Sequence, residues 1–87
     1  MIYIMLIGLL FERTIDEVDE HLELIEIIRK YMDRRGDTRK LKGAVTGEIV
    51  SEAVLNYANK KGLYVVVQSG DAVAIAAGAQ GFTAREW

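Results

Sequence analysis

The residues that could bind a metal stand together near the start of a charged segment. His21 is the only histidine, and Glu17 precedes it by four residues, with Asp16, Glu20 and Glu23 nearby. A helix would place Glu17 and His21 on one face, one turn apart, and carboxylates suit magnesium or manganese. A complete site needs ligands from a second element, and the sequence offers no obvious one. We therefore expect an exposed helical face, with metal binding by Glu17 and His21 as the alternative.

A basic segment follows this acidic one. Residues 12–26 contain seven acids and one base, whereas residues 29–42 contain seven bases and two acids. Acids near the start of a helix and bases near its end suit the helix dipole, so a solvated, polarised helix explains the pattern. The alternative is a surface that contacts nucleic-acid phosphates through Arg34, Arg35, Arg39 and Lys40, with salt-dependent affinity. No aromatic residue interleaves with these cations, as stacking on single strands would require.

Other patterns that could indicate a site are weak. Residues 43–47 lie between an expected strand and an expected helix, where a phosphate could rest on the helix N-terminus. They lack the P-loop and dinucleotide-binding patterns, so close packing is the better interpretation of Gly43 and Gly47. Gln68 and Asp71 are typical of a turn. We expect no catalytic residue.

Composition places the chain among small globular domains. It has 87 residues, of which 51% are hydrophobic and 28% charged, with a net charge of −2 and neither cysteine nor proline. These values exclude a disordered chain, a protein that coats nucleic acid through an overall positive charge, and a fold held together by disulfides. The apolar run from residue 2 to residue 11 is too short to span a bilayer and lacks the features of a signal peptide. One domain over residues 1–87, in the cytoplasm and without membrane contact, is expected.

Apolar periodicity and capping signals predict the elements that would position these residues. Thr14 and Glu17 form a capping box, and Gly36 is a natural helix end. The expected elements are a strand at 1–11 that is buried on both faces, a helix at 14–35, a strand at 41–46, a helix at 48–61, a strand at 63–68, a turn, a strand at 72–77 and an irregular tail. The predicted fold is α/β, with a small, mostly parallel sheet and the order β-α-β-α-β-β.

This order leaves part of the sheet without cover. If the first three strands lie in sequential order, both helices pack on one face and the other face is bare. A chain of this size is marginal as a monomer, so we expect a homo-oligomer, most simply a dimer, formed through that face or through a sheet edge. Ala72, Ala74 and Ala76 would give the last strand a face of small side chains.

Four sequence segments resemble those of a known protein family. They are VDEHL (18–22), KGAV (42–45), KGLYVVVQSGD (61–71) and GFTAREW (81–87). Together they resemble the C-terminal half of uncharacterised proteins with the restriction-endonuclease-like, or PD-(D/E)XK, fold, and the match covers most of the chain. That superfamily carries an acid-x-Lys motif that binds magnesium and activates water, and it should fall near residues 8–10. Gly8, Leu9 and Leu10 cannot perform this chemistry. The resemblance therefore implies a partial, non-catalytic nuclease-like domain.

Three functions follow as hypotheses. The first is a non-catalytic interaction module that contacts DNA or RNA through the basic segment and needs no cofactor. The second is a nuclease dependent on magnesium or manganese, with a site rebuilt across a dimer from Glu17, Glu20 or His21. The third is a structural subunit whose apolar first strand pairs with another protein. The abrupt start inside an apolar strand is also compatible with a truncated form of a longer protein.

Overall fold

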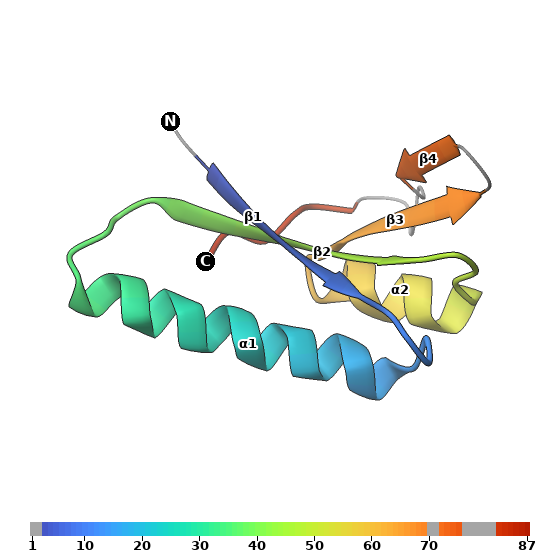
Figure 1. Ribbon diagram of the computed structural model, residues 1–87, viewed down its shortest axis with the longest axis horizontal. Coiled ribbons are helices and arrows are strands. Elements are labelled where there is room, and N and C mark those ends of the chain that lie inside the picture. Colours follow the sequence, from blue (N-terminus) through green and yellow to red (C-terminus); the bar gives the residue numbers. More distant parts are fainter. Residues whose placement is uncertain (1–2, 70–71, 76–81) are drawn as a thin grey trace.

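Strands and helices alternate in the computed structural model, which describes residues 3–69, 72–75 and 82–87 (Figure 1). Within these ranges the elements are β1 (Tyr3–Leu9), α1 (Ile15–Arg34), β2 (Lys40–Gly47), α2 (Glu52–Lys60), β3 (Tyr64–Ser69) and β4 (Ala72–Ile75). The predicted α/β class and the order β-α-β-α-β-β are confirmed. No helix in the described ranges is long and apolar enough to cross a membrane.

The strands form a mostly parallel sheet in the order β1-β2-β3-β4. β1, β2 and β3 are parallel, with Leu6 beside Gly43 and Thr46 beside Val66, and β4 runs antiparallel to β3. β1 is therefore an edge strand. Both helices lie on the same face of the sheet, as expected for sequential parallel strands joined by right-handed crossovers (Figure 1).

Local signals at both ends of α1 explain where it begins and ends. The Thr14 hydroxyl accepts a hydrogen bond from the Glu17 main-chain N–H at 3.3 Å, and the Glu17 carboxylate accepts one from the Thr14 main-chain N–H. This is the predicted capping box. Gly36 follows the helix with a φ of 73°, a conformation that glycine adopts without a steric penalty.

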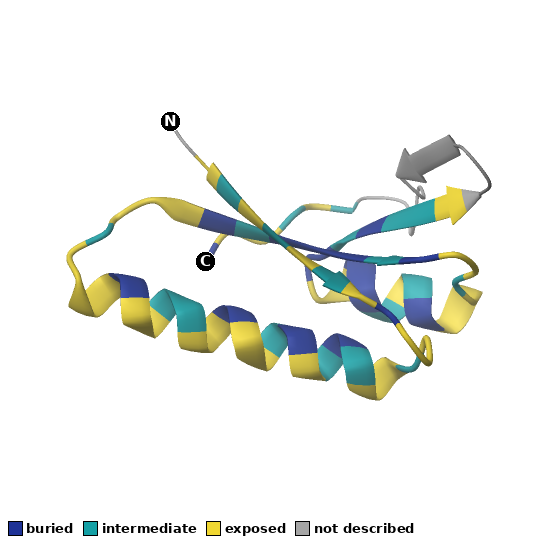
Figure 2. Ribbon diagram, in the orientation of Figure 1, coloured by how far each residue is buried: buried dark blue, intermediate teal, exposed yellow. Residues whose placement is uncertain are grey.

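The core lies between the sheet and the two helices. Val18 and Ile25 of α1, Val45 of β2 and Val65 of β3 are fully buried, and in Figure 2 the buried residues of α1 follow the side that faces the sheet. Gly43 allows the helix to approach closely, because a Cβ atom there would lie 2.6 Å from Ile25 Cδ1. The expectation of close packing is thus confirmed for Gly43 and wrong for Gly47, where a Cβ atom would lie no closer than 3.5 Å to another side chain.

Two expectations about these elements are wrong. α2 begins at Glu52 instead of Glu48, because the Ser51 hydroxyl accepts the Val54 N–H at 3.3 Å and caps the helix there. β1 is not buried on both faces: Ile4, Leu6 and Gly8 are half-buried on the helix side, whereas the residues that alternate with them are exposed. The alternation arises because the helices cover one face of the sheet.

The tail is anchored more firmly than its irregular sequence suggests. Leu41 and Trp87 exchange two main-chain hydrogen bonds, at 2.9 and 2.8 Å, and Arg85 N–H donates to the Gly62 carbonyl at 3.0 Å. Trp87 therefore pairs with β2 ahead of the point where β3 begins to pair with it. The turn at residues 70–71, the side chains of Ala72 and Ala74, and residues 76–81 lie outside the described part.

Candidate interaction surface

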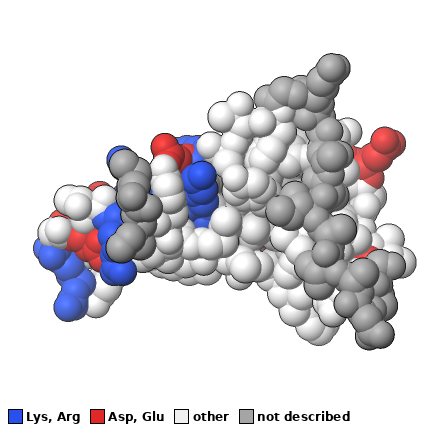
Figure 3. All heavy atoms as spheres, turned by 90° about the horizontal axis from the view of Figure 1, so that it is seen from above, with Lys and Arg blue, Asp and Glu red and all other residues white. Residues whose placement is uncertain are grey.

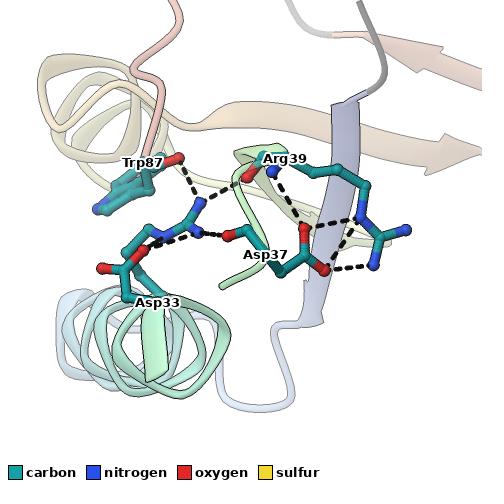
Figure 4. Close-up of polar contacts among 5 residues, drawn as sticks. Asp33, Asp37, Arg39 and Trp87 are labelled. Carbon is teal, nitrogen blue, oxygen red and sulfur yellow. Dashed lines mark hydrogen bonds and ion pairs between the residues drawn. The ribbon is translucent and has the colours of Figure 1, made fainter. Parts of the chain in front are cut away.

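Arg29 joins the segments at the basic end of the molecule, which comprises the end of α1 and the loop before β2. Its partners Asp33, Asp37, Arg39 and Trp87 are labelled in Figure 4. Its Nε donates to Asp33 Oδ1 at 3.0 Å, and its terminal nitrogens donate to the main-chain oxygens of Asp37, Arg39 and Trp87. These bonds join the end of α1, the loop before β2 and the tail. Arg29 therefore has a structural role, which the sequence pattern did not reveal.

Arg39 is compensated by a carboxylate. Its guanidinium forms a bidentate ion pair with the Asp37 carboxylate, and the shorter contact, from a terminal nitrogen to Oδ2, measures 2.6 Å (Figure 4). The side-chain hydrogen bonds from Arg39, together with its main-chain N–H, lower the pKa of Asp37 to about 2. Of the four predicted nucleic-acid-binding residues, Arg39 is thus already engaged by an anion.

Acid titration should reveal this contact. Because the pKa of Asp37 falls from 3.8 to about 2 on folding, the ionised form stabilises the fold above pH 3.8, and this contribution disappears as the pH falls toward 2. We expect the Asp37 carboxyl resonance to titrate near pH 2 by NMR. The stability gap between the parent and Asp37→Asn should close over the same pH range. A midpoint near 3.8 would contradict the ion pair.

The other predicted cations have different surroundings. Arg35 donates to the Tyr31 hydroxyl at 3.0 Å, and its guanidinium lies 5.5 Å from the centre of that ring, which is 58% exposed. Arg34 and Lys40 form no ion pair with the residues that the structure describes. The expectation that no aromatic residue accompanies these cations is therefore wrong, because one helical turn brings Tyr31 beside Arg35.

Lys40 also borders a shallow pocket of about 310 Å³ between α1 and the tail. Arg29, Asp33, Thr38 and Trp87 form the rest of its lining. Cations at this end are mixed with carboxylates, as the blue and red atoms on the left of Figure 3 show. The lining therefore combines the cation of Lys40 with the carboxylate of Asp33 and with an Arg29 that is already bonded within the fold.

Glu17 and His21 have separate structural contacts. The His21 side chain is buried instead of exposed, and its Nε2 lies 3.0 Å from the Leu6 carbonyl oxygen, in the space left by the missing side chain of Gly8. Desolvation opposes ionisation of Glu17, but main-chain N–H groups that include those of Phe11 and Glu12 outweigh it and lower its pKa. Within the described ranges, no three His, Asp or Glu side chains converge as metal ligands would.

A second surface, the β1 surface, consists of Tyr3, Met5, Ile7 and Leu9. Their side chains are between 42% and 67% exposed on the face of the sheet opposite the helices. In Figure 3 much of this face carries no charged atoms, but a cation lies on it at Tyr3, where Lys42 Nζ is 4.4 Å from the centre of the ring. Exposed apolar side chains in a continuous row mark interaction sites more often than singly scattered ones do.

The main chain of the same residues faces away from β2. Leu10 N–H donates to the Thr46 carbonyl at 2.7 Å. Because the N–H and C=O groups of every second residue point to the same side of a strand, Leu10 and every second residue before it direct their main-chain polar groups at β2. The residues between them, which form the β1 surface, direct their N–H and C=O groups at the free edge. Such an edge usually carries a lysine, proline or bulge that blocks pairing, and residues 3–9 contain neither lysine nor proline.

An apolar stripe on α1 borders this edge. Leu24, Ile28 and Tyr31 follow His21 at helical spacing, and His21 packs against β1. Leu24 is 48% exposed, Tyr31 is 58% exposed and Ile28 is half-buried. The opposite flank of α1 contacts α2 and the tail instead, through Asp19 and Glu26. The α1 stripe and the β1 surface therefore lie on the same side of the molecule.

No protein-family model, curated protein or solved structure matches this chain. The resemblance to restriction-endonuclease-like proteins thus stays a prediction.

Sequence reasoning identified the apolar first strand but not its exposure. The signal was present in the predicted topology, because a strand at the start of a sequentially ordered sheet lies at an edge. The stripe on α1 was hidden in one wide apolar face that also included the core positions Ile25 and Met32.

Proposed function

We propose that this chain is a non-catalytic interaction module that adds a strand of another polypeptide to the edge formed by β1. The observation that supports it is the coincidence of two properties in Tyr3, Met5, Ile7 and Leu9. Their apolar side chains are exposed, and their main-chain polar groups face the free edge. Strand addition satisfies such groups, and the alternating side chains supply specificity.

The contacts of the chemically capable side chains support a non-catalytic role. His21 is directed into the space between α1 and β1, Glu17 caps a helix, and Arg29 fastens three segments together. Each of these side chains is used to hold the fold. A catalytic acid, base or ligand instead needs access to a substrate.

Site-specific crosslinking in living cells tests this proposal. We expect a photoreactive benzoylphenylalanine at position 7 to yield a covalent adduct of defined mass with a polypeptide, whereas the same group at the exposed position 52 on α2 yields none. The Met5→Pro substitution should abolish the adduct, because it removes an outward N–H without touching the bonds to β2. Met5→Ala, which keeps that N–H, is its control.

The possible outcomes are distinct. Equal labelling at positions 7 and 52, or an adduct that survives Met5→Pro, would contradict strand addition at β1. An adduct at position 7 that depends on the outward N–H of Met5 would support it, and the mass of the adduct identifies the partner as a second copy or a different protein.

A second function, contact with nucleic acid, is favoured by a specific observation at the basic end. Arg34 and Lys40 have no carboxylate partner in the described part, and Arg35 lies on the exposed ring of Tyr31. Cations beside an aromatic ring are the usual components of a surface for single strands. We propose this contact as an additional property of the module.

Fluorescence anisotropy with labelled single-stranded DNA and RNA tests the second function. We expect binding at low salt that weakens with a slope of about −0.7 per phosphate contact in log–log form. Arg34→Ala with Lys40→Ala should remove about two contacts and flatten the slope by about 1.4. Arg39→Ala is the matched control, because that cation is compensated by Asp37. Absence of binding at low salt would exclude this function.

A further inference from the structure

We propose that the strand added at β1 belongs to a second copy of this chain, related by a two-fold axis that passes beside Leu6. This inference rests on the proposed function and names its partner. The two β1 strands then run antiparallel and join two sheets into one, with all helices on the same face.

The edge is self-complementary in this register. With Leu6 opposite Leu6 of the second copy, Tyr3 lies opposite Leu9 and Met5 lies opposite Ile7. All four residues that direct their polar groups outward then fall in hydrogen-bonded pairs. Their exposed side chains become apolar cross-strand neighbours on the open face, a stabilising arrangement in antiparallel sheets.

The α1 stripe falls close to the same axis. His21 Nε2 contacts the Leu6 carbonyl oxygen, and Ile25 contacts the position of Gly43, the residue paired with Leu6 in β2. The turn of α1 that contains Leu24 is thus level with the axis. Because α1 packs beneath β1 and β2, the two copies of α1 lie antiparallel, about two strand spacings or ~10 Å apart, which is a normal distance for packed helices.

Charge complementarity favours a second copy over an unrelated strand. The acidic start of α1 follows the end of β1 at Leu9, and its basic end leads to Lys40, which lies beside Tyr3. The two-fold axis brings the Leu9 end of one copy to the Tyr3 end of the other. The acidic half of each α1 therefore faces the basic half of its partner, and Glu12 comes near Arg35 of the second copy.

The first test is the oligomeric state by analytical ultracentrifugation. We expect a species of twice the 9.7 kDa chain mass at micromolar concentration. Met5→Pro removes two of the intermolecular hydrogen bonds and should raise the dimer dissociation constant roughly ten-fold or more, whereas Met5→Ala should have a smaller effect. A stable monomer, or a dimer that is indifferent to Met5→Pro, overturns the inference.

The position of the axis can be tested by a disulfide. The native chain has no cysteine, so Leu24→Cys introduces a single thiol close to the axis. We expect a crosslinked dimer on oxidation of this variant. Glu23→Cys, one residue away on an exposed part of the helix that does not face the partner, should stay monomeric on a denaturing gel. Equal crosslinking of the two variants contradicts this axis.

A charge swap tests the complementarity of the two helices. Glu12→Lys and Arg35→Glu should each weaken their own homodimer roughly ten-fold, and mixing the two variants should restore an association as tight as the parent's. Failure of the mixture to associate overturns the antiparallel arrangement. A monomeric chain whose position 7 is crosslinked to a different protein would overturn this inference alone and leave the proposed function intact.

Discussion

Gly43→Ala is expected to lower the free energy of unfolding by about 1–3 kcal/mol, the usual cost of forcing extra volume into a packed core. The added Cβ would lie 2.5 Å from Leu63 Cδ2 and 2.6 Å from Ile25 Cδ1. Both neighbours are fully buried, so neither can move into solvent. The strain falls on the contact between the central strand and α1.

Urea denaturation followed by circular dichroism measures this effect, and β2 supplies its own control. A Cβ at Gly47 would lie no closer than 3.5 Å to another side chain, which is ordinary van der Waals contact. Gly47→Ala should therefore stay close to the parent, because it adds the same methyl group to the same strand without overlap. Equal losses in both variants would show that general strand effects, and not packing at Gly43, determine the cost.

Trp87→Ala should destabilise the protein by about 3–5 kcal/mol, the typical cost of removing a buried aromatic side chain. The Trp87 ring is buried, and its Nε1 donates to Glu26 at 3.0 Å. Since small domains are stabilised by only about 5–15 kcal/mol in total, this variant should lose a large fraction of its stability and unfold at a clearly lower temperature than the parent. Its effect arises from packing, because the main-chain pair with Leu41 does not require the indole.

Thermal unfolding by far-ultraviolet circular dichroism is the suitable measurement, because the variant lacks the single tryptophan of the chain. Glu86→Ala is the neighbouring control on an exposed residue, where substitutions usually change stability by less than about 0.5 kcal/mol. Trp87→Phe should fall between the two, since it keeps an aromatic ring but loses the donor to Glu26. A Trp87→Ala variant as stable as Glu86→Ala would mean that the docked tail contributes little.

Features that depend on neighbouring residues could be predicted from the sequence. The capping box at Thr14 and the left-handed Gly36 are local signals, and the alternation of helical and strand patterns gave the order of elements and the parallel sheet. The predicted start of α2 at Glu48 was wrong. Both the acidic Glu48 and Ser51 can signal a first helical turn, and the Ser51 hydroxyl determines the start because it caps the helix.

Features that depend on contacts between distant segments could not be predicted from the sequence. The pairing of Trp87 with Leu41 and the packing of His21 over Gly8 join residues that no periodicity connects. The same holds for the candidate surfaces. Composition showed that β1 is apolar, but only the position of β1 in the sheet shows which face is covered, and only the fold shows that Arg29 and Arg39 already have partners.

The pairing of Leu41 with Trp87 also bears on the order of events during synthesis. Part of one edge of β2 is paired by Trp87, which is synthesised long after β2 itself. On the ribosome, β1, α1 and β2 emerge first, yet part of the β2 edge and the space beneath Gly43 stay open until residue 87 has left the exit tunnel. The docking of Trp87 is therefore a late step relative to the synthesis of β2, and until then this part of the β2 edge is available to other strands.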